Sequence, residues 1–165
     1  MEMTSDPAGE AHKDYTGAVY GSLLAASVVV GAGTLGRFPR LEMIVLLVGT
    51  GIVFWATHVY ARLFGARLAF HGLKTADVRR ACAEEWPIVK AAVPPAVAVA
   101  VGPVLGLGAQ GTGWLALTVA VAGQVGWAAV AAVKIGAPPR MVVITSVVNL
   151  LLGLVMVALK AALHH

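Results

Sequence analysis

The sequence predicts an all-α membrane protein: a polytopic bundle of about five transmembrane helices, with a short amphipathic cytoplasmic helix between the second and the third. Of the 165 residues, 59% are hydrophobic and only 12% are charged, whereas a soluble domain is about 25% charged. The hydrophobic residues also gather in stretches of about 20, enough for a helix to cross roughly 30 Å of hydrocarbon. We expect residues 1–165 to form a single transmembrane domain.

The first hydrophobic stretch is predicted to cross the membrane over about residues 17–35. The segment before it is mainly acidic, unlike the basic start of a signal peptide, so we expect this span to stay attached. Gly17 and Gly21 have the four-residue spacing that lets two membrane helices approach closely. With 19 glycines in the chain, this spacing could equally arise by chance. The second span is predicted over about residues 41–63.

The longest polar stretch of the chain, residues 64–85, connects the second span to the third. Thr75 can cap a short helix there, and Val78, Cys82 and Trp86 recur every four residues, which would give that helix an apolar face. Such a helix would lie on the membrane surface. The alternative is a solvated connector in which the periodicity has no structural meaning.

The remaining three spans are predicted over about residues 87–106, 114–133 and 141–163. Aromatic and basic residues often mark the depth of the lipid headgroups, with long basic side chains reaching out toward the phosphates. Four residues are predicted interface anchors on this basis: Arg62, Trp86, Lys90 and Trp114.

Two consecutive prolines, Pro94 and Pro95, lie inside the third predicted span and indicate a helix break. A proline has no N–H, so each one leaves the carbonyl four residues earlier, at Lys90 and Ala91, without its helical donor. Broken membrane helices can form ion or substrate sites in transporters. The commoner outcome is a kink whose carbonyls are accommodated by packing.

The distribution of lysine and arginine predicts the orientation of the chain. If the 64–85 connector is cytoplasmic, nine of the 12 basic residues fall on that side and three on the other. Because cytoplasmic loops are enriched in basic residues, we expect a cytoplasmic N-terminus. An odd number of spans then puts the C-terminus outside.

Polar residues inside the predicted spans are the candidates for function, because the bilayer makes them costly. His58 shares a face of the second span with Thr50; it could titrate near neutral pH or simply hydrogen-bond a neighbouring helix. Gln124 and Asn149 lie near the middles of the fourth and fifth spans. An amide facing lipid would be unsatisfied, so we expect both to face other helices, either as helix contacts or along a polar path.

The sequence gives no support for catalysis, metal binding or nucleic-acid binding. It contains no phosphate-binding glycine loop, no paired-cysteine metal motif and no catalytic serine motif, so we expect neither an enzyme nor a cofactor. His58 is the only histidine within a predicted span, whereas a haem held by two histidines would need a second. The net charge of +4 comes without a basic patch interleaved with aromatics, so no nucleic-acid partner is expected.

The segments VYGSLLAASVVVGAG, FWATHVYARLFGARL and EEWPIVKAAVPP resemble small multi-span integral membrane proteins of high-GC, actinobacterial-type bacteria. The resemblance covers about two thirds of the chain. It implies a location in the bacterial plasma membrane and carries no assigned activity.

Two functions therefore stay open, and a structure can discriminate between them. The first is a small homo-oligomeric channel or transporter with a polar path along Thr50, His58, Gln124 and Asn149. The second is a non-transporting structural, assembly or accessory subunit. A polar crevice lined by those residues would favour the first, and a dry interior packed with alanine and glycine the second. The expected partners are the lipid bilayer and further copies of the chain.

Overall fold

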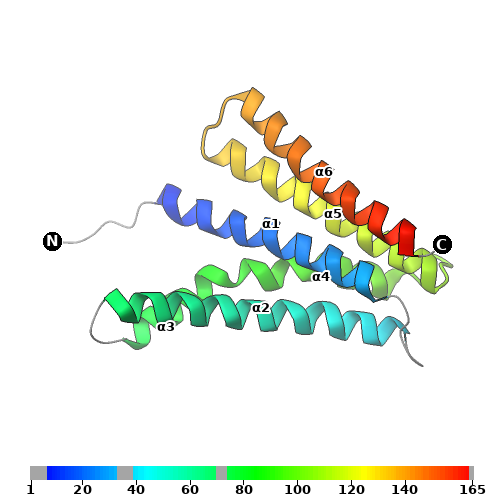
Figure 1. The fold of residues 1–165 in the computed structure, drawn as a ribbon, viewed down its shortest axis with the longest axis horizontal. Coiled ribbons are helices and arrows are strands. Elements are labelled where there is room, and N and C mark those ends of the chain that lie inside the picture. Colours follow the sequence, from blue (N-terminus) through cyan, green and yellow to red (C-terminus); the bar gives the residue numbers. More distant parts are fainter. Residues whose placement is uncertain (1–6, 33–38, 70–73, 164–165) are drawn as a thin grey trace.

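The all-α prediction is confirmed by the computed structural model, which describes residues 7–32, 39–69 and 74–163 and shows no strand among them. Six helices account for nearly all of these residues (Figure 1). Their bounds are α1 Pro7–Gly31, α2 Pro39–Ala69, α3 Thr75–Glu85, α4 Pro87–Val101, α5 Ala109–Lys134 and α6 Pro139–Leu163.

Three helices are long and apolar enough to cross a bilayer: Pro39–Gly65 of α2, Ala109–Lys134 of α5 and Pro139–Ala162 of α6. The apolar part of α1 is shorter, at Tyr15–Gly31. Helix α4 has 15 residues, or about 22 Å at 1.5 Å per residue. The helices are those of a membrane protein, and two of them are short for a full crossing.

The third predicted span ends further along the chain than α4 does. It was predicted to reach residue 106, but α4 ends at Val101 and a turn follows. The Gly106 N–H donates to Pro103 O and the Leu107 N–H to Gly102 O, both at 3.0 Å. Gly106 has a φ of +71°, which glycine adopts without strain. These bonds close the helix end and reverse the chain toward α5.

The predicted helix break at Pro94 and Pro95 is wrong, because α4 runs through both residues without interruption. Proline fixes φ near −65°, which is a helical value, so its cost is the missing N–H and a local clash rather than the backbone conformation itself. Packed neighbours can absorb that cost in membrane helices. Helix α4 has α1, α2 and α5 as such neighbours.

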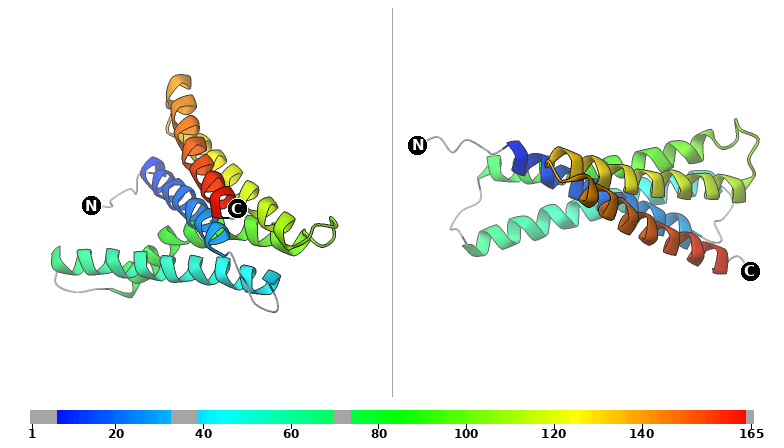
Figure 2. Two further views of the ribbon diagram at one scale, coloured as in Figure 1. Left: turned by 45° about the vertical axis from the view of Figure 1, so that its right-hand side comes forward. Right: turned by 90° about the horizontal axis from the view of Figure 1, so that it is seen from above.

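The helices form a bundle that is closed at one end and splayed at the other (Figures 1 and 2). Helices α1 and α4 lie between α2 and the α5–α6 hairpin, and the hairpin diverges from α2 toward the end at which α1 begins. This splayed end also carries the end of α2, the start of α4 and the turn between α5 and α6. The closed end carries the α4–α5 turn and the end of α6.

The buried cluster of the bundle is apolar and built mainly from alanine and valine. It draws on α1, α2, α4 and α5 and comprises Ala25, Ala26, Val29, Val30, Met43, Leu47, Ala96, Val99, Ala116, Leu117, Ala120 and Val121. Small side chains let helix backbones approach closely, which strengthens van der Waals packing between membrane helices.

Two glycines of α1 lie at the contact with α4. A Cβ on Gly21 would stand 2.7 Å from the Ile88 carbonyl oxygen, and one on Gly17 would stand 3.6 Å from the Ile88 side chain. The four-residue glycine spacing of the first span thus belongs to a helix contact rather than to chance.

The connector contains the predicted helix, α3, but its cap is Lys74 rather than Thr75. The Lys74 N–H donates to Asp77 Oδ2 at 3.0 Å, as in a capping box. Helix α3 is docked on α2, since Trp55 Nε1–H donates to the Cys82 carbonyl at 2.9 Å.

Candidate functional site: an amide pair and two cavities

The two mid-span amides lie side by side between α5 and α6. Gln124 Nε2 donates to Asn149 Oδ1 at 3.2 Å, and Asn149 Nδ2 donates to the Thr145 carbonyl at 2.9 Å. Gln124 is fully buried. The pair joins two helices through polar groups that would otherwise be unsatisfied in an apolar surrounding.

The bonding order fixes the orientation of both amides. The Thr145 carbonyl can only accept, so Asn149 must present its NH₂ there and its oxygen to Gln124. Gln124 therefore presents its NH₂ to Asn149, which leaves Gln124 Oε1 as a buried acceptor with no partner in the structure. The two hydrogen bonds thus run from Gln124 to Asn149 and from Asn149 to the Thr145 carbonyl, and Gln124 Oε1 accepts none from the described residues.

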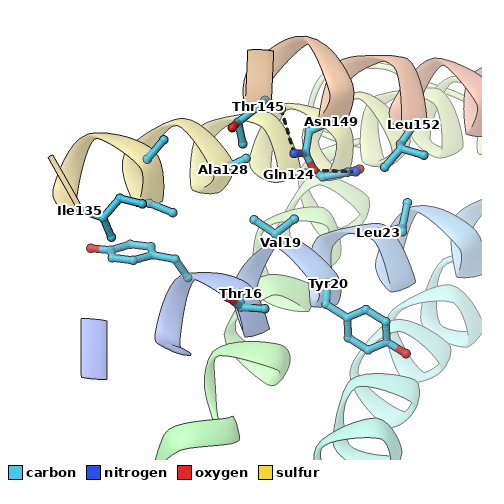
Figure 3. A pocket seen from close by; sticks show the side chains of 13 residues that line it. Thr16, Val19, Tyr20, Leu23, Gln124, Ala128, Ile135, Thr145, Asn149 and Leu152 are labelled. Carbon is cyan, nitrogen blue, oxygen red and sulfur yellow. Dashed lines mark hydrogen bonds between the residues drawn. The ribbon is translucent and has the colours of Figure 1, made fainter. Parts of the chain in front are cut away.

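An apolar groove of about 400 Å³ lies next to this pair, between α1 and the α5–α6 hairpin (Figure 3). Val19 and Leu23 of α1 face Gln124 and Asn149 across it. The groove is lined by Tyr15, Thr16, Val19, Tyr20, Leu23, Gln124, Ala128, Ala131, Ala132, Ile135, Thr145, Asn149 and Leu152. Most of this surface is hydrocarbon, so the groove suits an apolar occupant.

A second cavity, of about 490 Å³, lies between α1, α2 and the start of α4 and is more polar. It is lined by Thr16, Gly17, Tyr20, His58, Arg62, Glu85 and Ile88. The ring centroids of Tyr20 and His58 are 5.2 Å apart. We call this cavity the His58 crevice. It brings together a phenol, an imidazole and an ion pair at the splayed end of the bundle.

His58 is oriented by its own helix. Its Nδ1 lies 2.9 Å from the Phe54 carbonyl, and because a carbonyl only accepts, Nδ1 carries the hydrogen. In the neutral ring, Nε2 is then the acceptor. This arrangement fixes the tautomer and leaves one ring nitrogen for a further partner.

Arg62 ties α2 to the end of α3. It forms ion pairs with Glu84 and with Glu85, the latter at 2.8 Å between Nη1 and Oε1. Arg80 joins the same cluster, with Nε 2.7 Å from Glu84 Oε1. The sequence predicts that the guanidinium of Arg62 reaches lipid phosphate; in the structure it also has two carboxylate partners, and its side chain is 35% exposed.

The other predicted site residues do not come together with His58 or with the amide pair. Thr50 is partly buried on α2 and is not among the described residues that line either cavity. Trp86 packs edge-on against Trp55, with ring centroids 5.6 Å apart, and is 43% exposed. Lys90 is exposed on α4. The predicted polar path is therefore split into separate contacts.

Tyr20 is a residue that the sequence analysis did not single out. It lines both cavities, and its ring turns toward α2, where it meets Phe54 and His58. Thr16, one turn earlier, also lines both. A polar residue repeated at four-residue spacing in an apolar span was the available signal.

Lys160 was counted as a charge of the outer side, but its side chain is only 4% exposed. Its Nζ donates to the Val29 carbonyl at 3.2 Å and lies 5.7 Å from the centre of the Trp114 ring. Val29 is in the last turn of α1, where carbonyls lack helical donors and a cation is favourable. Trp114, predicted as an interface anchor, supports this contact. The available signal for this contact in the sequence was a charged residue inside the predicted 141–163 span.

Comparison of the chain with known protein families, with curated proteins and with solved structures gives no match. Within the residues described, no group of three or more His, Cys, Asp or Glu side chains is placed to hold a metal ion.

Proposed function

We propose that the chain is a multi-pass protein of the bacterial plasma membrane and serves as a non-transporting assembly or accessory subunit. One observation carries this proposal: the middle of the bundle is filled. Val29, Leu47, Val99 and Leu117 are each at most 1% exposed and pack together between the His58 crevice and the closed end. This apolar packing among the described residues supports a role other than transport for a single copy.

The same proposal includes five crossings, by α1, α2, α4, α5 and α6, with a cytoplasmic N-terminus. Its support is the placement of basic residues at the two ends of the bundle. The splayed end carries Lys74, Arg79, Arg80, Lys134 and Arg140, and the closed end Arg40 and Lys160. Cytoplasmic ends of membrane proteins are the more basic ones.

Cysteine accessibility tests the orientation. With Cys82 replaced by serine, Gln110→Cys at the α4–α5 turn should react with a membrane-impermeant maleimide in intact cells. Lys74→Cys at the start of α3 should react only after the membrane is opened. Both positions are exposed on the protein, so the membrane alone decides the result. The reverse labelling pattern would overturn the orientation.

Ion flux tests the absence of transport. Purified protein in vesicles with potassium and proton gradients should give no flux above that of empty vesicles. The His58 crevice is the observation that favours the other candidate, a homo-oligomeric channel or transporter. Flux that is present in the wild type, lost in His58→Ala and retained in Thr57→Ala, an exposed neighbour on the same helix, would replace the accessory proposal with transport.

A further inference from the structure

The groove between α1 and the α5–α6 hairpin has the length of one lipid leaflet. It runs from Gln124 of α5 to Ile135, just after the end of that helix, and 11 steps of 1.5 Å give a length of about 16 Å. The hydrocarbon core of a bilayer is roughly 30 Å thick. In a bilayer, a groove of this length would run from one surface to about the midplane, with the amide pair in its wall near the inner end.

The lining of the groove changes from its inner end to its mouth. Along its length the walls are aliphatic, with Val19, Leu23, Ala131 and Leu152 among them. The two amides in its wall bond to one another, and Gln124 is covered by its neighbours. An acyl chain would meet methyl and methylene groups along nearly the whole groove.

Cationic and aromatic groups gather at the mouth. Lys134 Nζ lies 5.4 Å from the ring centre of Tyr15, a residue that lines the groove. The Tyr15 ring packs on Trp127, with centroids 5.8 Å apart. Arg140, at the other side of the short α5–α6 turn, is exposed. Aromatic rings and basic side chains at this depth are the groups that meet lipid headgroups.

The described carboxylates at the end of α3 have basic partners of their own. Glu84 and Glu85 pair with Arg62, and Glu84 also pairs with Arg80. Lys134 and Arg140 are exposed beside the hydrocarbon groove. Basic sites between membrane helices on the cytoplasmic side are where anionic headgroups bind.

We propose that this groove binds one anionic phospholipid, with an acyl chain between α1 and the hairpin and the phosphate at Lys134 and Arg140. The occupant holds the splayed end together, because it contacts α1, α5 and α6 at once. The site does not depend on whether the chain transports anything, but the choice of an anionic headgroup rests on the proposed cytoplasmic orientation of the splayed end.

Lipid binding to delipidated protein in detergent, counted by native mass spectrometry, tests the proposal. The probes are phosphatidylglycerol and phosphatidylcholine. We expect one phosphatidylglycerol to bind each chain in preference to phosphatidylcholine. Lys134→Gln and Arg140→Gln should each weaken that binding about fivefold, since a basic residue near an anionic surface contributes about 1 kcal/mol. Ala131→Phe should abolish it by filling the groove.

Matched variants separate a site from general charge or bulk. Lys90→Gln removes an exposed cation from α4, and Ala122→Phe adds a ring to an exposed position of α5 outside the groove. Both should bind phosphatidylglycerol as the wild type does. Circular dichroism verifies that each variant is folded, and Lys134→Gln and Arg140→Gln keep the test valid if Ala131→Phe does not fold.

Several outcomes would overturn the proposal. Equal binding of the two lipids would remove the anionic headgroup from it. An equal loss in Lys90→Gln or Ala122→Phe would reduce it to surface charge or bulk. Displacement of phosphatidylglycerol by inorganic phosphate would indicate a phosphate site without a lipid chain. A dimer that Ala131→Phe disrupts and added lipid leaves unchanged would put a second copy in the groove.

Discussion

The two sides of the bundle are built differently. In the α1–α2–α4 part, helices approach so closely that a Cβ on Gly21 would stand 2.7 Å from a backbone oxygen of α4. Helix α6 is much more exposed. Only 6% of its most apolar 18-residue stretch is buried inside the protein, against 39% of the corresponding stretch of α5. The exposed large hydrophobic side chains of α6 are valine, leucine, isoleucine and methionine.

This contrast shows what holds each part in a membrane. An apolar helix surrounded by lipid gains nothing from burying its surface in protein, because lipid tails are as apolar as leucine. Helix α6 can therefore remain exposed on its outer side, while Gly153, Asn149 and Lys160 attach its other side to the bundle. Helices α1 and α4 depend instead on close shape complementarity.

The largest effect is expected where a helix lies against the backbone of its neighbour. Gly21→Val places a side chain against the Ile88 carbonyl and the Ala91 Cβ, and should destabilise the protein by about 3 kcal/mol through overpacking. Gly49→Val is the matched control, since a Cβ there would meet nothing within 4 Å. Thermal unfolding in detergent, followed by circular dichroism, should show a clear loss only for Gly21→Val. Equal melting temperatures would contradict the close α1–α4 contact.

Lys160→Met should have the next largest effect. It removes the ammonium group from the Val29 carbonyl and from the Trp114 ring, at a cost of about 2 kcal/mol for a hydrogen bond to a charged group. Leu159→Met, at an exposed neighbouring position, should melt like the wild type. A more stable Lys160→Met protein would mean that the burial cost of this charge exceeds the strength of its contacts.

Gln124→Leu and Asn149→Leu should each cost about 1 kcal/mol, within the range measured for hydrogen bonds between membrane helices. Because the two side chains share one bond, the double variant should lose less than the sum of the two single losses. The double-mutant cycle is measured from the same melting curves. Strictly additive losses would show that the two amides do not interact.

The smallest effect is expected on the lipid-facing side of α6. Val148→Ala, at a position 49% exposed, should change stability by at most about 0.5 kcal/mol. The same substitution at Val29, which is 0% exposed, should cost about 2 kcal/mol through lost contacts and a cavity. Similar losses at both positions would mean that another protein surface covers α6.

Local features of the structure could be predicted from the sequence. The apolar stretches, the amphipathic helix at residues 75–85 and the glycine pair of α1 depend on spacing along a single helix. The inward position of Gln124 follows from the cost of an unsatisfied amide in hydrocarbon. Each of these inferences needs only one segment and its solvent.

The remaining features depend on where helices sit relative to one another. The partners of Arg62 come from α3 and the partners of Lys160 from α1 and α5, and no spacing rule gives such contacts. The continuity of α4 through Pro94 and Pro95 could not be predicted for the same reason, because neighbouring helices decide whether a helix tolerates these prolines. Tyr20 acquires its place between the two cavities only once α1 lies between α2 and α5.

The fluorescence of the tryptophans can report on separate helix contacts. The four tryptophans of the chain lie at different helix contacts: Trp55 and Trp86 where α2 meets the α3–α4 connection, Trp127 beside Tyr15 of α1, and Trp114 beside Lys160 of α6. Indole emission depends on polarity and on nearby quenchers. Variants that retain a single tryptophan would show in which order these helix contacts are lost during unfolding. They would also show whether the α5–α6 hairpin separates before the rest.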